Sequence, residues 1–152
     1  MKIWQRNFTI AQLNEFIPCT AMAALDIEFT EFGDDYLKAR MPVTDNSSQP
    51  MGYLHGGASA LLAESVASMA GNMCCELDYA CLGQEFNCNH LRSARIGDVV
   101  EATAKPVHLG RKTQVWQVDI VNAGNGKLLC CARITMFISH VENHRKPKSE
   151  NK

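Results

Sequence analysis

One segment, residues 56–75, limits the possible folds of this chain more than any other. Its length and residue types predict a single long helix that is small or apolar on almost every side. One narrow stripe at helical spacing is bulky and is expected to pack on a sheet: Leu62, Val66, Met69 and Met73. The opposite stripe consists of small residues, where a water-exposed helix would carry Lys, Glu or Gln. Such a helix is expected to be covered on both sides.

Most of the remaining chain alternates apolar and polar residues, which is the pattern of half-buried strands. Residues 25–32 and 36–42 flank the turn sequence Gly-Asp-Asp and are predicted to form a hairpin. Four more strands are predicted at about residues 80–91, 98–108, 112–122 and 127–138. Short turns join the last three, which should pair as an antiparallel meander. This order predicts an α+β domain with the helix laid on one face of a sheet.

The region before the first strand is expected to contain two short helical elements. Thr9 and Gln12 fit a capping box, and apolar residues follow at helical spacing up to Pro18. A second short turn is expected near residues 20–24.

Length and charge exclude several classes of protein. A chain of 152 residues, 46% of them hydrophobic, suits one domain with a real core and is too short for two. A net charge of −1 lacks the basic excess of nucleic-acid-binding domains. The N-terminus is too charged for an export signal, and the most apolar run, residues 54–75, contains His, Glu and Asn, which argues against a membrane span. We therefore expect a cytoplasmic protein.

The seven cysteines form no recognisable disulfide or metal pattern. Cys74-Cys75 and Cys130-Cys131 are adjacent pairs, and no C-x-x-C or paired zinc spacing occurs. They are expected to be small reduced residues of the core. The sequence HVENH at residues 140–144 lacks the H-E-x-x-H order and lies in a polar end of the chain, so we expect no metal site.

Glu64 is an unusual residue for the long helix. It lies on the small-residue stripe with Ser68, one helical turn away, and no Lys or Arg occurs between Arg40 and Arg92. A buried carboxylate without a partner costs several kcal/mol. A Glu without a functional role would be expected to reach solvent at the edge of the helix. The Ser68 hydroxyl on the same stripe favours a functional acid instead.

The start of the same helix, His55-Gly56-Gly57, is suited to bind an anionic oxygen. The first amides of a helix have no intrahelical acceptor, and the helix dipole favours negative charge there. Glycines leave room for a substrate to reach these N–H groups. Together with Glu64 and Ser68, this turn indicates acyl transfer or hydrolysis.

Three blocks of the sequence resemble one family: QPMGYLHGGASALLAESVASMAG at 49–71, GQEFNCNHLRSAR at 83–95 and HLGRKTQVWQVDI at 108–120. They are similar to the hotdog-fold acyl-CoA thioesterases, in the branch with 4-hydroxybenzoyl-CoA and 1,4-dihydroxy-2-naphthoyl-CoA thioesterases. The resemblance implies a hotdog fold, in which a curved antiparallel sheet wraps a long central helix. It covers residues 1–139 as a single domain and leaves 140–152 as a polar C-terminal tail. It also implies a homodimer joined sheet edge to sheet edge, and a dimer of dimers, hence a homotetramer.

The resemblance assigns roles to individual residues of the expected site. Glu64 would be the catalytic acid, as nucleophile or as general base on water, and Ser68 would hold the water or Glu64. The Gly56 amide would polarise the thioester carbonyl, with His55 and Gln49 placing the acyl group. Gln49, His55 and Gly56 would face Glu64 of the other subunit. His90 matches a family position beside the substrate.

Coenzyme A is expected as part of substrate and product, with no separate cofactor and no metal. Arg92, Arg95, Arg111 and Lys112 follow the long stretch without basic residues and suit its phosphates. The resemblance implies that the CoA-binding residues are Gly83, His90, Leu91, Arg92, Ser93, His108, Leu109, Gly110, Arg111, Lys112 and Thr113. Met51, Tyr53, Met69 and Met73 are expected to line or back the acyl pocket.

The expected activity is hydrolysis of an acyl-CoA, with an aromatic acyl group such as 1,4-dihydroxy-2-naphthoyl favoured by the branch. Three alternatives remain open at this point. The first is a proofreading thioesterase that acts on thioesters of an acyl carrier protein, which would then be a partner. The second is a hotdog dehydratase or hydratase that uses a His with an acid. The third is an acyl-CoA-binding sensor without catalysis.

Overall fold

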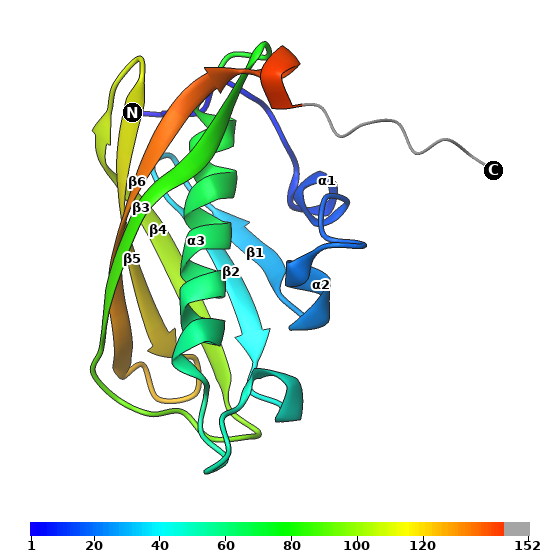
Figure 1. The fold of residues 1–152 in the computed structure, drawn as a ribbon, viewed down its shortest axis with the longest axis vertical. Helices are drawn as coiled ribbons and strands as arrows, with labels where there is room; N and C mark the ends of the chain where they lie inside the picture. Colours follow the sequence, from blue (N-terminus) through cyan, green and yellow to red (C-terminus); the bar gives the residue numbers. More distant parts are fainter. Residues whose placement is uncertain (145–152) are drawn as a thin grey trace, which may run out of the picture.

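The computed structural model describes residues 1–144, and the last eight residues of the expected tail lie outside this range. Figure 1 shows one long helix held by a curved sheet, with two short helices beside it. The elements are α1 (Ile10–Asn14), α2 (Ala21–Ala24), β1 (Glu28–Phe32), β2 (Leu37–Pro42), η1 (Asp45–Ser47), α3 (Gly56–Met73), β3 (Tyr79–His90), β4 (Val99–Leu109), β5 (Thr113–Asn122), β6 (Leu128–His140) and η2 (Val141–His144).

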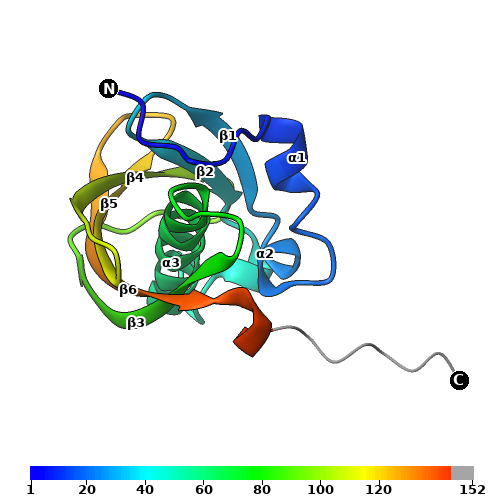
Figure 2. The same cartoon turned by 90° about the horizontal axis from the view of Figure 1, so that it is seen from above.

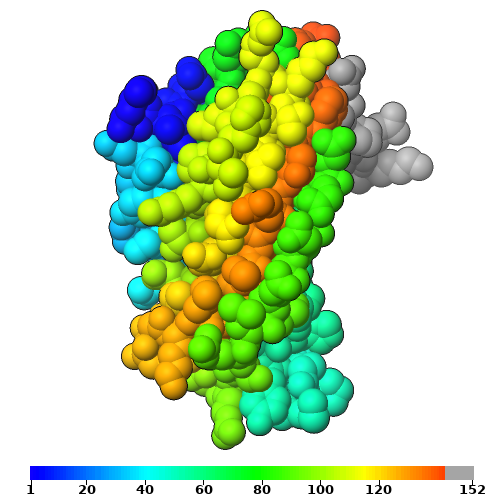
Figure 3. Space-filling view, turned by 90° about the vertical axis from the view of Figure 1, so that its left-hand side faces the viewer, coloured from blue at the N-terminus to red at the C-terminus, as the bar shows by residue number. Residues whose placement is uncertain are grey.

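The six strands form one antiparallel sheet in the order β1-β2-β4-β5-β6-β3. The expected meander of the last three strands is confirmed as β4-β5-β6. Seen along the helix, the sheet curves around α3 (Figure 2). The predicted α+β class and hotdog architecture are confirmed. Strand β3 lies at one free edge and runs along one margin of the outer face, in green in Figure 3.

The core fills the space between the concave face of the sheet and α3. Strand residues alternate between the buried concave face and the outer face, so Trp116 of β5 and Ile134 of β6 are fully buried against the helix. The helix contributes Leu62 and Val66, both without exposed surface. Met69 departs from the expected bulky stripe, because it is only partly buried and faces a cavity.

This chain's own sheet covers only part of the small-residue stripe of α3, since Gly57 and Glu64 remain exposed. Ala67 and Gly71 are buried where the helix meets β3 and β5. At Gly71 a Cβ atom would lie 2.6 Å from Cys81 Sγ and 2.8 Å from Gln114 Oε1. Asn72 joins the same helix turn to β3, because its side chain donates to Cys81 O and accepts from Cys81 N, both at 3.0 Å. Small residues here allow the close approach of helix and sheet.

The N-terminal segment crosses the C-terminal end of α3. The amides of Gln5 and Arg6 both donate to Met73 O, at 2.9 and 3.0 Å. The Arg6 guanidinium donates to three further backbone carbonyls, those of Cys75, Glu76 and Tyr79. These contacts close the helix at Met73, two residues before the end that the sequence predicts.

Two other differences from the prediction have local causes. The first strand begins at Glu28 and not at residue 25, because Asp26 has a φ of 52° that belongs to a turn. The last strand continues through His140, whose ring meets Tyr79 edge-on at 5.5 Å, and η2 follows it. The polar tail expected from residue 140 therefore begins with ordered structure. The capping box of Thr9 and Gln12 is confirmed at the start of α1.

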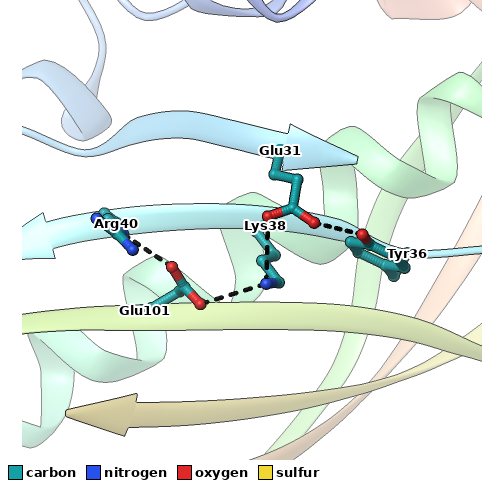
Figure 4. Close-up of polar contacts among 5 residues, drawn as sticks. All are labelled: Glu31, Tyr36, Lys38, Arg40 and Glu101. Carbon is teal, nitrogen blue, oxygen red and sulfur yellow. Dashed lines mark hydrogen bonds and ion pairs between the residues drawn. The ribbon is translucent and has the colours of Figure 1, made fainter. Parts of the chain in front are cut away.

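An ion-pair network ties three strands together on the outer face of the sheet (Figure 4). Lys38 of β2 lies 3.3 Å from Glu31 of β1 and 3.5 Å from Glu101 of β4, and Arg40 lies 2.8 Å from Glu101. The Tyr36 hydroxyl donates to Glu31, and this bond, more than Lys38, holds the pKa of that carboxyl below its usual range. Because the network is partly exposed, it sets strand register more than it adds stability.

In the part of the chain that the structure describes, no helix has both the length and the apolar character needed to cross a membrane.

The contact at Gly71 leads to the first prediction. Helix propensity alone would make Gly71→Ala stabilising, by about 1 kcal/mol. The added methyl would overlap Cys81 and the Gln114 side chain, which is fixed by a 2.9 Å bond from Trp116. We expect a net loss of about 1–2 kcal/mol in the free energy of unfolding. Urea titration measures it, and an unchanged or raised midpoint would contradict the close packing.

Candidate active site

A cavity of about 510 Å³ lies between α3 and the N-terminal segment. The short helices α1 and α2 lie on the side of α3 that the sheet leaves open (Figures 1 and 2). The α3 wall of the cavity consists of Leu61, Glu64, Ser65, Ser68, Met69 and Asn72. The N-terminal wall consists of Arg6, Phe8, Phe16 and Met22. The structure therefore brings Glu64 and Ser68 into one cavity.

The Glu64 side chain extends from α3 over the edge strand. A Cβ atom on Gly83 would overlap Glu64 Oε1, so the carboxylate lies directly on the backbone of β3 at this point. The strand also has an irregular register between Gly83 and Glu85. Gly83, which the sequence assigned to CoA binding, thus lies directly against the candidate catalytic acid of its own chain.

Glu64 forms no ion pair within residues 1–144. Arg6 lines the same cavity, but its guanidinium is engaged by backbone carbonyl oxygens at the end of α3. The carboxylate is also largely exposed to the cavity and its solvent. It is therefore available to a substrate or to a water molecule, as a general base or nucleophile must be.

The other group of candidate residues lies at the start of α3. His55 is the N-cap, and its Nδ1 accepts the Gly57 N–H at 2.8 Å. When the His55 ring is neutral and its Nδ1 accepts this hydrogen bond, the ring proton is on Nε2. The Nε2–H group is then a hydrogen-bond donor on the exposed side of the ring. The Gly56 N–H lies in the first turn of α3 and has no hydrogen-bond acceptor within the helix. These two N–H groups can serve an oxyanion.

His90 and Gln49 flank this helix start. A Cβ on Gly56 would lie 2.9 Å from His90 Nε2, so the imidazole covers the glycine of its own chain. Gln49 lies in the loop before α3, where its side-chain oxygen accepts the Met51 N–H. This loop is closed by a hydrogen bond from Gln49 N to Tyr53 O of 2.8 Å. The structure thus gathers Gln49, His55, Gly56 and His90 at one end of α3.

The two groups are separated within one chain. Gly56 and Glu64 are eight residues apart on α3, which corresponds to about 12 Å along the helix axis. A thioester carbonyl is too small to touch both. One chain therefore holds the two groups of candidate residues at two different positions along α3.

The expected CoA-binding residues also divide into two groups. Residues 90–93 follow the end of β3, where Leu91 N and Arg92 Nη1 donate to Leu129 O and Leu128 O. Residues 108–113 form the β4–β5 turn. His90 pairs with Cys130 and Thr113 with Phe137, seven residues apart on β6, or about 23 Å. One chain does not bring these groups together.

The 108–113 turn borders a second cavity of about 980 Å³ at the end of the sheet. Its basic residues are Arg111 and Lys112, both exposed. Tyr79, Phe137 and His140 line the same cavity. An apolar wall beside two cations suits a ligand with both an organic body and phosphate groups.

Sequence reasoning missed the N-terminal wall of the first cavity. Phe8 and Phe16 pack edge to face with ring centroids 5.8 Å apart, and Phe16 remains 51% exposed. The only signal was the presence of aromatic residues on either side of a helix too short to bury them. Of the four residues expected around the acyl group, only Met69 lines this cavity, since Met73 is buried in the core and Met51 is exposed.

Tyr53 likewise lies away from the cavity, because it pairs with Arg95 across a β-bridge and its ring lies 5.5 Å from that guanidinium. The residues expected at the acyl pocket thus belong to three different places. The spacing of residues along one helix does not predict which residues from distant segments of the chain line the same pocket.

Comparison with known proteins agrees with this fold. Residues 51–129 match the thioesterase superfamily. The chain is 46% identical over 136 residues to the 1,4-dihydroxy-2-naphthoyl-CoA hydrolase of Escherichia coli, covering 90% of this chain and 98% of that protein. It is 40% identical over 136 residues to the proofreading thioesterase EntH of Cronobacter turicensis, covering 90% and 98%. A thioesterase crystal structure from Haemophilus influenzae superposes with a TM-score of 0.89 at 41% identity, covering 95% and 99%.

The fold and the site define an enzyme class, the thioester hydrolases. The chain belongs to the thioesterase superfamily, with the hotdog architecture of its solved members.

Proposed function

We propose that the protein hydrolyses an acyl-CoA thioester to the free acid and CoA, with Glu64 as the catalytic carboxylate. One observation carries the proposal. The Glu64 carboxylate has no ion-pair partner in the described chain and shares a cavity of acyl size with Ser68. The similarity to a 1,4-dihydroxy-2-naphthoyl-CoA hydrolase supports CoA as the thiol.

The chemistry needs a base or nucleophile and an oxyanion site. As a base, Glu64 takes a proton from water while the water oxygen bonds to the thioester carbon. The C–S bond then breaks, and CoA leaves as the thiol with the proton that Glu64 accepted. As a nucleophile, Glu64 itself bonds to the carbon while the C–S bond breaks and CoA leaves as the thiolate, which takes a proton from water. A water molecule then cleaves the resulting anhydride to the free acid and the Glu64 carboxylate. In either route the Gly56 N–H donates a hydrogen bond to the carbonyl oxygen as this oxygen gains negative charge. Such a bond typically lowers the activation free energy by about 3 kcal/mol.

Ser68 and His55 have supporting roles in this proposal. Ser68 lies one turn after Glu64 and orients the carboxylate or the attacking water. His55 presents Nε2–H beside Gly56 and directs the carbonyl toward the amide. Gln49 and His90 border the same helix start and confine the acyl group.

We further propose that two subunits complete each site. Strand β3 is a 12-residue edge strand with unpaired backbone groups along one side, a surface that favours pairing with a second strand. A twofold antiparallel pairing of two β3 strands would bring the α3 start of one subunit toward Glu64 of the other. The same operation brings residues 90–93 of one subunit toward residues 108–113 of the other, where CoA would bind. Pairing of two such dimers would give a homotetramer.

An aromatic acyl group fits the cavity best. Phe8, Phe16 and Met22 face Leu61 and Met69 across it, and flat rings pack well among such side chains. The similarity to EntH supports the alternative donor, an acyl carrier protein, since both donors end in the same thioester arm. A hydratase or an acyl-CoA sensor would release no thiol, so thiol release separates these alternatives from hydrolysis.

Replacement of Glu64 tests the main proposal. We expect Glu64→Gln to lower turnover of benzoyl-CoA and 1,4-dihydroxy-2-naphthoyl-CoA at least about 100-fold, because a neutral amide cannot accept the proton or attack. A thiol-release assay measures turnover, and circular dichroism and CoA binding should stay unchanged. Glu28→Gln, at an exposed carboxylate of β1, is the matched control and should keep full activity. Near-normal turnover in Glu64→Gln would eliminate Glu64 as the catalytic acid.

Mixed dimers test the shared site. In a dimer of one Glu64→Gln chain and one His55→Ala chain, a shared arrangement leaves one intact site and one doubly damaged site. Mixed dimers that carry both tags should show about half of wild-type turnover, because each has one working site of two. Differently tagged chains, co-expressed and purified through both tags, allow the measurement. If each site lay within one chain, mixing would restore nothing.

Truncation of the aromatic wall tests the acyl preference. We expect Phe16→Ala to raise KM for aromatic acyl-CoAs several-fold and to leave acetyl-CoA turnover nearly unchanged, because a two-carbon acyl group does not reach the ring. Val107→Ala, at an exposed apolar residue of β4, serves as control. Equal effects on all acyl chains would mean that this cavity does not hold the acyl group.

A further inference from the structure

We propose that Cys88, His90 and Cys130 form a binding site for one divalent ion of the zinc class. One sulfur or nitrogen atom of each side chain lies within 4.8 Å of the others. Thiolate sulfur and imidazole nitrogen are the ligands that zinc prefers in proteins. From spacing along the sequence alone we expected no metal site, and the present proposal differs from that expectation.

Strand pairing creates the cluster. Cys88 and His90 are two residues apart on β3, so their side chains project on the same face. Cys130 is the direct partner of His90 on β6. The two cysteines are 42 residues apart in sequence, a separation that no zinc motif has, which explains why the pattern escaped the sequence analysis.

The distances suit a tetrahedral ion. With metal–sulfur and metal–nitrogen bonds of about 2.3 and 2.0 Å, a tetrahedral site places sulfur and nitrogen about 3.5 Å apart and two sulfurs about 3.8 Å apart. Cys88 Sγ lies 3.5 Å from His90 Nε2. Closing the remaining pairs from at most 4.8 Å requires shifts of roughly 1 Å, which small side-chain rotations supply.

A disulfide is a poorer interpretation of the same two sulfurs. Cys88 pairs with Ala132, whereas Cys130 pairs with His90, so the cysteines are diagonal neighbours. Diagonal residues of an antiparallel pair lie about 7–8 Å apart, beyond the usual Cα separation of a disulfide. A metal ion spans this gap because it adds two bonds between the sulfurs.

The charges also balance. Two thiolates and a neutral imidazole cancel the charge of a divalent ion, so the occupied site is neutral where Cys130 is buried. Each metal–sulfur bond replaces the S–H bond of a thiol, whose proton is released to solvent. His90 is exposed, which leaves the fourth position of the ion open to solvent.

The site adjoins the start of α3. The nitrogen that would bind the metal, His90 Nε2, is the atom that lies against Gly56. An ion there would occupy the approach to the Gly56 amide. We infer that occupancy slows thioester hydrolysis, a consequence that rests on the proposed function, whereas metal binding itself does not.

Cobalt(II) titration of the reduced, chelator-treated full chain tests the binding. We expect one equivalent of cobalt to give a thiolate-to-cobalt charge-transfer band and the strong visible bands of tetrahedral cobalt, and zinc to remove both. Cys88→Ala should abolish them, while Cys131→Ala, at the neighbouring cysteine on the other face of β6, should keep them. Absence of the bands in the wild type, or their persistence in Cys88→Ala, would overturn the site.

Turnover tests the consequence separately. One equivalent of zinc should lower wild-type turnover several-fold and leave Cys88→Ala unaffected, while both proteins have equal turnover without zinc. Cobalt bands with undiminished turnover would overturn the inhibitory effect alone. Equal inhibition of both proteins would assign the effect to another metal site. A protein that shows the bands but hydrolyses no thioester would refute the proposed function and leave the metal site standing.

Discussion

The close approach of α3 to the concave sheet is the constraint on which the other features depend. The helix carries alanine and glycine where it faces β3 and β5, so its backbone lies near the strands and the sheet can curve around it. At Gly71 the approach is so close that even a methyl group would overlap β3 and β5 side chains. The bidentate bond of Asn72 to Cys81 fixes the same level of the interface. With the helix held in this position, Glu64 reaches across the edge strand at Gly83 and enters the cavity.

This geometry divides the chemistry of the site into two parts. The acid lies near the middle of α3, and the oxyanion donors lie at its start, because only a helix terminus offers free amides. A single helix cannot bend to bring these parts together. A helix that presents both parts on the side facing an open sheet edge can instead serve two sites, each with the acid of one subunit and the amide of another. In the proposed dimer, this arrangement would account for a chain that contains both groups of candidate residues but does not bring them together.

The sequence predicted the regular elements well and the cavity poorly, for identifiable reasons. Periodicity and turn residues located α3 and all six strands to within a few residues, since these signals are local. The resemblance to the thioesterases pointed to Glu64, Ser68 and the Gly56 turn, and the fold places the first two in one cavity. The aromatic wall of Phe8 and Phe16 and the Cys88–Cys130 cluster escaped notice because both depend on contacts between distant segments. Met69 was expected both on the stripe that packs on the sheet and at the acyl pocket, and in the structure it is partly buried and lines the cavity.

The contact of Arg6 with the end of α3 has a consequence for the order of folding. Its partners Cys75, Glu76 and Tyr79 are about 70 residues further along the chain. During synthesis, the N-terminal segment therefore emerges long before the carbonyls that hold it, and contacts of such separation form late. The wall that would select the acyl group is thus made well before the carbonyls that hold it, and it is among the last parts to take its place. Until then an apolar groove along α3 is exposed to solvent. Exposed apolar surface of this kind makes a folding chain prone to aggregation.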